Sequence, residues 1–241
     1  MADENPASPS ARKAHRFDLH MHSFFSPDAA DSPERLIAAA KARGLSGIAI
    51  TDHDNCDVHA DLIAKGLERG DGAAVDGFLV VPGVEVSTAD GHLLCLGTTL
   101  PVMAGKPAAE VAEAIHARGG LAIPAHPYDR WRSGIREEVL DRVPFDGLEV
   151  FNAAVSSRTS NTQALEYAKR RGLSMTASSD AHHASAVGVS ATVFDLETLD
   201  LASLMAALRK GGRPEGEYLS RAEALKKHFG NWFRILNRRK D

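Results

Sequence analysis

The stretch FDLHMH, residues 17–22, predicts the first strand of the chain and decides how the rest is organised. It brings two imidazoles, His20 and His22, to the end of that strand. Successive side chains of a strand point to opposite faces, so residues two apart point to the same side. A single metal ion can therefore take both histidines, and the stretch predicts a metal site at the end of the first strand.

Outward from this stretch, short apolar runs alternate with helical patterns. Ser32 caps a helix that has Pro33 in its first turn, and Gly44 ends it. The remaining pattern predicts strands over residues 47–51, 78–87 (interrupted by a turn), 92–97, 121–126, 147–151 and from 173, with helices over 58–67, 108–118, 134–142, 161–171 and 199–210.

Strands that alternate with helices indicate parallel βαβ units. About seven such units in one body of this size favour a single α/β domain, either a barrel or a doubly wound sheet. We expect residues 1–14 to be a disordered tail and residues 15–220 to be the domain. Residues 221–241 predict a basic amphipathic segment: a terminal helix docked on the domain, or an arm for a membrane surface or nucleic acid.

Composition narrows the functional classes. The chain has 241 residues, of which 44% are hydrophobic and 25% charged, so it can form a core. Its net charge of −4 supplies no global field for nucleic acid or membrane. No apolar run reaches the roughly 18 residues of a membrane span, so we expect no integral membrane association. Two cysteines and no secretory signal predict a cytoplasmic protein, and the oligomeric state stays open.

Metal-ligand residue types stand at nearly every strand end. A lone histidine there is usually a satisfied polar residue, but burying six of them beside carboxylates without partners would cost several kcal/mol per group. In parallel barrels the carboxyl ends of the strands converge on one face. We therefore expect the following residues to meet in one metal-binding pocket: His20, His22, Asp52, His53, Glu85, His92, His126, Asp180 and His182.

These residues lie in segments that closely resemble the PHP family, named for polymerase and histidinol phosphatase. The matching segments are DLHMHSFFSPD (18–28), TDHD (51–54), PGVEVS (82–87), GHLLCLG (91–97), PAHP (124–127) and SSDAH (178–182). The resemblance implies a distorted (β/α)7 barrel that binds up to three metals and hydrolyses phosphoesters.

Carried across by position, the resemblance implies three metal sites. His20, His22, Glu85 and Asp180 would hold the first metal. A bridging Glu85 with His92 and His126 would hold the second, and Asp28, His53 and His182 the third. We expect two to three divalent ions, because mixed imidazole and carboxylate ligands suit Zn²⁺, Mn²⁺ or Fe²⁺.

The chemistry expected of such a trinuclear site is attack on phosphorus by a metal-activated hydroxide. Asp52 would orient His53 or simply cap its strand. The general acid is not identified; His183 is a candidate, and a metal-bound water is the other. Fixed positive charge for the phosphate is available from Arg158 and from Arg130 and Arg132, although loop arginines are often only solvated. Trp131 would stack on a base or sugar, or anchor its loop.

The function expected from the sequence is hydrolysis of a phosphomonoester, either a small phosphometabolite or a nucleotide. The alternatives are an exonuclease on short oligonucleotides, an amidohydrolase-type hydrolase and a non-catalytic metal-bearing regulator. The remaining histidines match no ligand position, so we interpret them as surface residues: His15, His59, His116 and His228. Cys95 is expected in the core and Cys56 has no assigned role.

Overall fold

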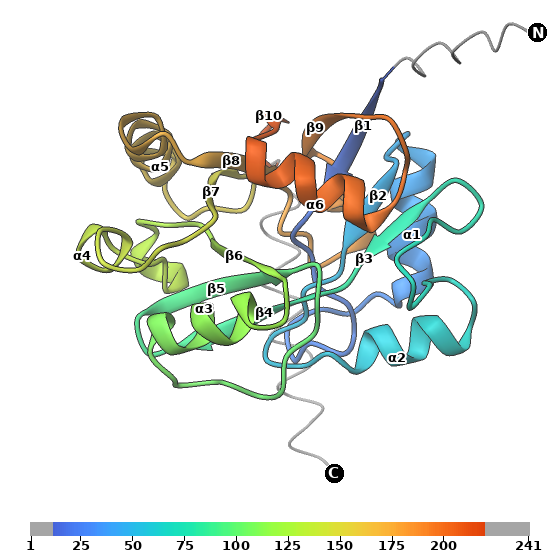
Figure 1. Cartoon of the computed structure of the whole chain (residues 1–241), viewed down its shortest axis with the longest axis horizontal. Coiled ribbons are helices and arrows are strands. Elements are labelled where there is room, and N and C mark those ends of the chain that lie inside the picture. Colours follow the sequence, from blue (N-terminus) through green and yellow to red (C-terminus); the bar gives the residue numbers. More distant parts are fainter. Residues whose placement is uncertain (1–11, 220–241) are drawn as a thin grey trace, which may run out of the picture.

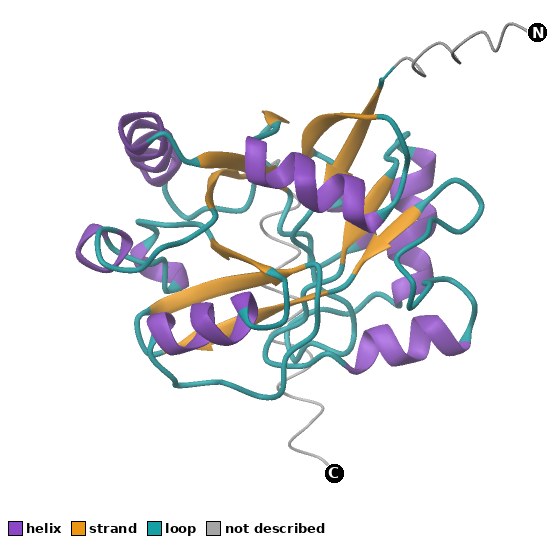
Figure 2. Cartoon of the chain, in the orientation of Figure 1, coloured by secondary structure: helices purple, strands orange, loops and turns teal. Residues whose placement is uncertain are grey.

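The computed structural model describes residues 12–219 as a mixed α/β domain in which helices surround the strands (Figures 1 and 2). The strands are β1 (Lys13–Asp18), β2 (Gly47–Ala49), β3 (Leu79–Val81), β4 (Gly83–Thr88), β5 (Gly91–Leu96), β6 (Leu121–Pro124), β7 (Gly147–Asn152), β8 (Ser174–Ser178), β9 (Ser190–Leu196) and β10 (Arg213–Gly216). The helices are α1 (Pro33–Ala42), α2 (Asp57–Ala64), α3 (Ala108–His116), α4 (Glu137–Leu140), α5 (Arg158–Arg171) and α6 (Leu201–Lys210), with 3-10 turns η1 (Arg130–Arg132) and η2 (Ala184–Ala186).

The strands form three sheets. The first has the order β10-β9-β1-β2-β3, in which β1, β2 and β3 are parallel and β9 runs antiparallel to both β1 and β10. The second, β4-β5-β6, is antiparallel throughout, and the third pairs β7 and β8 in parallel. The α/β class is confirmed. Parallel pairing holds for β1, β2 and β3 and for β7 and β8, but not for the second sheet, where β4 and β5 are joined by a tight turn that only antiparallel neighbours permit.

The described residues contain no closed barrel, so the (β/α)7 barrel is not confirmed. The sheets still adjoin one another. The backbone N–H of Asp146, just before β7, donates to Ala122 O in β6, and the Thr192 hydroxyl of β9 bonds both the N–H and the C=O of Ala177 in β8. A side chain thus takes the place of a ladder bond between β8 and β9.

Helices cover the sheets through their apolar faces. Helix α1 begins where the sequence predicts, because the Ser32 hydroxyl accepts from the Arg35 N–H and Pro33 occupies the first turn. Helix α6 begins in the same way at Asp200. The helices contribute buried side chains to three hydrophobic core clusters. These side chains come from α1 and α2 (Leu36, Ile37, Leu62), from α3 and α5 (Val111, Ile115, Tyr167) and from α6 (Leu204, Leu208).

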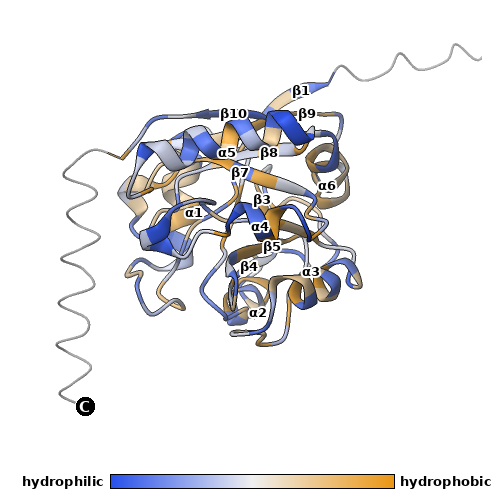
Figure 3. Ribbon diagram, turned by 90° about the vertical axis from the view of Figure 1, so that its left-hand side faces the viewer, coloured by the Kyte–Doolittle hydropathy of each residue, from blue (hydrophilic) through white to orange (hydrophobic). Residues whose placement is uncertain are grey.

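Several boundaries differ from those predicted. Strand β1 begins at Lys13, two residues before the expected domain start, because its pairing with β9 extends that far. It ends at Asp18, so His20 and His22 lie beyond the strand rather than in it as predicted. Strands β9 and β10 were not predicted, and β10 is a hydrophilic edge strand (Figure 3). Helix α5 begins at Arg158 rather than at residue 161. The expected C-terminal segment, and residues 1–11 of the expected N-terminal tail, lie outside the described residues.

Among the helices of the described part of the chain, none is long and apolar enough to cross a bilayer.

Candidate metal centre

Glu85 is the hub of the ligand cluster. Its side chain is fully buried in β4. Oε1 lies 2.8 Å from His92 Nδ1 and 3.1 Å from His126 Nε2. Oε2 lies 3.1 Å from the Nε2 atoms of both His20 and His22. Four imidazoles from three parts of the sequence thus lie within 3.1 Å of one carboxylate.

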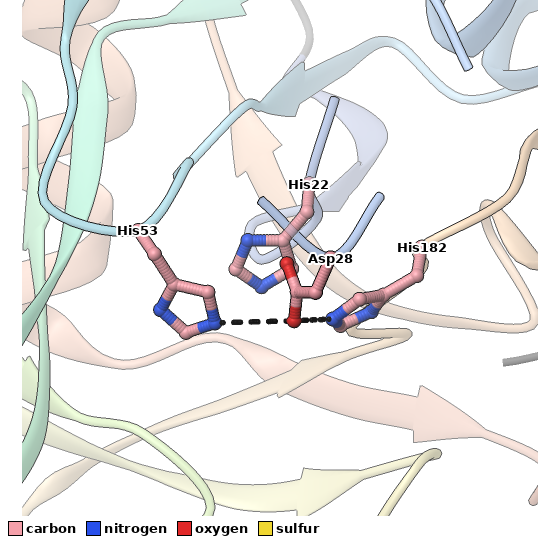
Figure 4. Close-up of side chains that lie close together, drawn as sticks. All are labelled: His22, Asp28, His53 and His182. Atoms are coloured by element: carbon pink, nitrogen blue, oxygen red, sulfur yellow. Dashed lines mark hydrogen bonds and ion pairs between the residues drawn. The ribbon is translucent and has the colours of Figure 1, made fainter. Parts of the chain in front are cut away.

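A second group of ligand types lies beside this hub and centres on Asp28. Its Oδ2 is 2.9 Å from His182 Nε2 and 3.6 Å from His53 Nε2. The ring of His22 lies next to both, with centroids 4.5 Å from His53 and 4.4 Å from His182. Figure 4 shows these four side chains pointing toward one another from three separate segments. Asp180 connects the two groups, since its Oδ1 is 3.4 Å from both His22 Nε2 and His182 Nδ1.

The nine residues of the three implied metal sets are therefore brought together. Ligand atoms within 4.8 Å of one another form four overlapping groups: His22, Asp28, His53 and His182; His20, His22 and Glu85; His20, His126 and Asp180; and His53, Glu85 and His92. The first of these groups contains the whole predicted third set. The division into three separate metal sets stays a prediction.

The donor atoms fit divalent cations. His20 Nδ1 lies 3.1 Å from Glu149 Oε1, and because a carboxylate only accepts, Nδ1 carries the hydrogen. Nε2 lies 3.1 Å from Glu85 Oε2 and 3.3 Å from His22 Nε2, so this position needs a positive charge, either a second hydrogen on His20 or a metal ion. The Nδ1 atoms of His22 and His126 are buried without a hydrogen-bond partner, so a ligand at Nε2 would fix those rings.

The electrostatics of the cluster also favour added positive charge. Burial by itself favours neutral His20, but Asp180, Glu85 and Glu149 raise its pKa well above the usual value. Burial would raise the pKa of Glu85, yet the histidines around it, His20 first among them, lower that pKa well below its usual range. His126 differs, because burial and the charge of Arg132 lower its pKa and so keep it a neutral donor.

Glu149 holds two of the ligands and was missed by sequence reasoning. Besides His20, it accepts the backbone N–H of His126 at 2.7 Å through Oε2, and Asn152 Nδ2 donates to the same oxygen at 3.0 Å. Its side chain is fully buried in β7. The available signal was a carboxylate inside the apolar run GLEVF, since an unpaired charge there would be costly.

Two buried aspartates clamp the loops that carry other ligands. Asp18 accepts from the Ser179 N–H at 2.9 Å and from the Ser179 hydroxyl, and it also bonds the Gly188 N–H at 2.8 Å. Asp52 accepts from both the N–H and the hydroxyl of Ser23, each at 2.6 Å. Asp52 therefore fixes the loop after His22, and its described contacts do not include the predicted one with the His53 ring.

The backbone is strained at two of the ligands. His126 and Asp180 have φ angles of 31° and 52°, in the left-handed region that favours glycine. Their neighbours hold them there: the Asp180 N–H donates to His20 O at 2.9 Å, and the His126 N–H donates to Glu149. Such strain clusters at functional sites, where surrounding bonds over-determine the geometry.

The predicted phosphate-binding arginines lie in different surroundings. Arg132 is largely buried, and its guanidinium donates to Asp180 Oδ2 and, at 3.4 Å, to Asn152 Oδ1. Arg130 is exposed on the same turn. Arg158 is also exposed, and its guanidinium lies over the ring of Tyr218, 4.2 Å from the centroid. Of the three, Arg132 is the one in described contact with the ligand cluster.

The structure also places three residues for which the sequence makes other predictions, namely His183, His59 and Cys95. His183 is half-buried beside His182, and its ring makes none of the described contacts with the cluster. The surface interpretation of His59 is wrong: this residue is 2% exposed, and its Nδ1 lies 2.8 Å from the buried Glu68. Its Nε2 lies 2.9 Å from Gly83 O, so this pair supports the start of β4. Cys95 is in the core as predicted.

Comparison with known proteins agrees with the motifs. The PHP-associated family model matches residues 158–212. An uncharacterized protein of Methanocaldococcus jannaschii is 32% identical over 146 residues, which cover 56% of this chain and 81% of that protein.

Two solved structures share the fold at low identity. One is a two-domain protein of Bacteroides vulgatus, named as containing a predicted PHP-like metal-dependent phosphoesterase, with a TM-score of 0.70, 18% identity and coverage of 96% of this chain and 74% of that one. The other is a lesion-specific endonuclease of Pyrococcus furiosus, with a TM-score of 0.66, 19% identity and coverage of 84% and 58%. With the ordered ligand motifs in place around Glu85, the match to the PHP-associated family model and the Methanocaldococcus jannaschii relative assign the chain to the PHP family.

Proposed function

We propose that this protein is a metal-dependent phosphoesterase that hydrolyses a phosphomonoester, either a small phosphometabolite or a nucleotide. The observation that carries the proposal is the convergence of four imidazole nitrogens on the two oxygens of buried Glu85. The proposed ligands are the nine predicted residues, with Glu85 bridging, and the proposed metals are two to three ions of Zn²⁺, Mn²⁺ or Fe²⁺.

Bound divalent ions at such a site supply an activated water and offset charge on phosphoryl oxygens. The chain's own residues arrange the rest. Glu149 keeps the hydrogen of His20 on Nδ1, so that Nε2 stays a donor to metal. Arg132 reaches the same cluster with its guanidinium, a planar group suited to grip two phosphate oxygens. No serine or cysteine nucleophile is needed in this scheme.

A substrate panel tests the proposal. The protein is stripped of metal, reloaded with Mn²⁺ or Zn²⁺, and assayed on p-nitrophenyl phosphate, nucleoside monophosphates, short oligonucleotides and simple amides. We expect phosphate release from the monoesters that requires added metal. Turnover of amides alone would replace the proposal with an amidohydrolase, and metal binding without turnover of anything would favour a regulator.

An exonuclease on short oligonucleotides is the second candidate. The structure of endonuclease Q in complex with a duplex substrate is similar to this chain, with a TM-score of 0.65 and 19% sequence identity. The same panel separates the two functions: release of mononucleotides from an oligonucleotide, faster than release of phosphate from monoesters, would favour the nuclease.

The two kinds of arginine give a sharper test of phosphate binding. Arg132→Ala should weaken kcat/KM for a phosphomonoester by roughly 10–150-fold, the range for loss of a charge-assisted pair. Lysine should restore only part of this, because it lacks the planar fork. Arg158→Ala should stay near wild type, because its guanidinium lies on Tyr218. The reverse order of effects would move the phosphate site to Arg158. Metal content is measured on each sample.

A further inference from the structure

One short turn connects the ligand cluster to a hollow that the proposed chemistry does not use. In η1 the side chain of Arg132 reaches Asp180 in the cluster, whereas Trp131, the residue before it, is 88% exposed. Trp131 lines a hollow of about 600 Å³ between this turn and the start of α5. Trp131 and Arg132 are consecutive residues, so the same turn contributes one side chain to the hollow and the next to the cluster.

The turn is held rigidly. Asp129 is 1% exposed, and its Oδ1 accepts the Trp131 N–H at 3.1 Å. Its Oδ2 accepts the Ser156 N–H at 2.6 Å, which ties the turn to the loop before α5. Arg132 reaches across to the same loop, at 3.4 Å from Ala154 O. Because the backbone that carries the Trp131 ring is already fixed, a ligand that packs on the ring costs little additional conformational entropy.

The part of the lining that comes from the start of α5 is uncharged and rich in hydrogen-bonding groups. It consists of Ser157, the N-cap of α5, and of Thr159, Ser160 and Gln163 in the first two turns. Three hydroxyls and an amide can serve both donors and acceptors of a ligand. Such a lining suits a hydroxylated group rather than a hydrocarbon chain.

Charge in the hollow is nearly balanced. The lining includes two positively charged residues, Arg130 and Arg136, and three negatively charged ones, Asp129, Glu137 and Glu138. Most of these are engaged: Arg136 donates to Tyr128 O at 3.1 Å, Glu137 pairs with Arg170, and Asp129 accepts the backbone bonds described above. A further phosphate would meet these carboxylates, so the hollow favours an uncharged group.

We propose that this hollow is the subsite for the leaving group of the substrate and that it takes a nucleoside, with the base stacked on Trp131 and the sugar hydroxyls facing α5. The inference rests on the proposed phosphoesterase function and narrows its substrate to an ester of a nucleoside with one phosphate. The nucleoside belongs either to a free monophosphate or to the phosphorylated end of a short oligonucleotide, and both present the same chemistry to the subsite.

The test compares two substrates in Trp131→Ala and Trp131→Phe. We expect Trp131→Ala to raise KM for a nucleoside monophosphate roughly 5–150-fold, as loss of one base–aromatic stack does, and to leave KM for methyl phosphate unchanged. Phenylalanine should restore most of the affinity. Because Trp131 is exposed, its removal should not unfold the protein. Ile63→Ala, which removes an exposed apolar side chain on α2, is the matched control and should change neither KM.

A binding measurement supplies a readout that does not depend on turnover. The chain has two tryptophans, so Trp232→Phe leaves Trp131 as the reporter. A nucleoside monophosphate should quench its fluorescence in the metal-loaded protein, and methyl phosphate should not. Parallel titrations with a nucleoside monophosphate and a terminally phosphorylated oligonucleotide distinguish the two sources by which binds more tightly.

The outcomes separate the inference from the proposed function. Equal KM changes for both substrates, or no change for the nucleotide, would overturn the subsite. A wild-type protein that hydrolyses no phosphoester but still shows nucleotide-specific quenching would remove the phosphoesterase and retain a nucleoside site. Absence of both turnover and quenching would remove both proposals.

Discussion

The ligand cluster has two halves that are built differently. Glu85 and His92 stand inside β4 and β5, within an antiparallel ladder that pairs Glu85 with Leu94 and His92 with Ser87. The other seven residues of the cluster lie outside the named strands, and among them His20, His22 and Asp180 stand in loops beyond the ends of β1 and β8. We call these the strand-borne and the loop-borne half.

The loop-borne half depends on buried carboxylates where the strand-borne half depends on the ladder. Asp18 holds the loop of Asp180 through Ser179, and Asp52 holds the loop of His22 through Ser23. Glu85 is placed instead by strand pairing on both of its sides, since its N–H also donates to Thr51 O at 3.2 Å.

This difference predicts which property a mutation in each half should change. A change in the strand-borne half should remove metal without destabilising the fold, because the ladder remains. A change in a carboxylate of the loop-borne half should affect local order first and metal second. The following predictions try to break this division, from the largest expected effect to the smallest.

The largest effect is expected for Glu85→Gln. The substitution keeps the shape of the side chain but removes the charge that keeps cations together. We expect loss of at least one metal and a fall in kcat of at least ~10²-fold, with the melting temperature of metal-free protein unchanged or higher. Elemental analysis, steady-state kinetics and calorimetry measure the three quantities.

The matched control for this change is Glu113→Gln, on an exposed position of α3, which should resemble wild type in all three measurements. Normal turnover by Glu85→Gln would remove its bridging role. A collapse of the fold in the metal-free variant would show that the strand-borne half is not placed by its ladder alone.

A smaller loss is expected for Glu149→Gln. Glutamine can still accept one hydrogen bond, but it cannot accept both from His20 and from the His126 N–H at separate carboxylate oxygens. The ring of His20 then loses its fixed tautomer, and metal affinity or activity should fall about 10–100-fold. Competition with a chelator of known affinity measures the metal affinity of the variant. An unchanged metal affinity would show that Glu149 contributes only to the fold.

Most of the proposed metal ligands could be predicted because they combine a metal-binding side chain with the end of a predicted strand, whereas Asp28 was predicted only from the family resemblance. FDLHMH and SSDAH carry that signal in the sequence itself. The placement of Arg132 against Asp180 could not be predicted, since it depends on a loop whose course is set by Asp129 and by left-handed residues such as Tyr128. Local patterns do not encode such non-local bonds.

The pairing of the strands was also beyond the sequence pattern. Residues 83–88 and 91–96 read as buried strands of either direction, because burial on both faces removes the alternation that marks an antiparallel pair. Strand β9 was missed, although its burial is nearly complete. His59 was misread because its partner Glu68 lies nine positions away, across the end of α2. In each case a contact between distant segments decided the outcome.

The smallest effect on activity is expected for Asp52→Ala. The change leaves the N–H and hydroxyl of Ser23 buried without their acceptor, which should lower the free energy of unfolding of metal-free protein by about 1–3 kcal/mol. Ser23→Ala removes only the hydroxyl bond and should cost less. The double variant should cost less than the sum, because the two residues share one interaction. Urea unfolding measures the stability of all three variants.

The control is Asp146→Ala, which removes a comparable bond, to the Ala122 N–H at 2.8 Å, and should lower stability without changing metal affinity. Asp52→Ala should also lower metal affinity, but only a few-fold by mass action, because just the loop of His22 is released. A loss of metal as large as that of Glu85→Gln would contradict the division into two halves, and strictly additive costs would show that Asp52 does not act through Ser23.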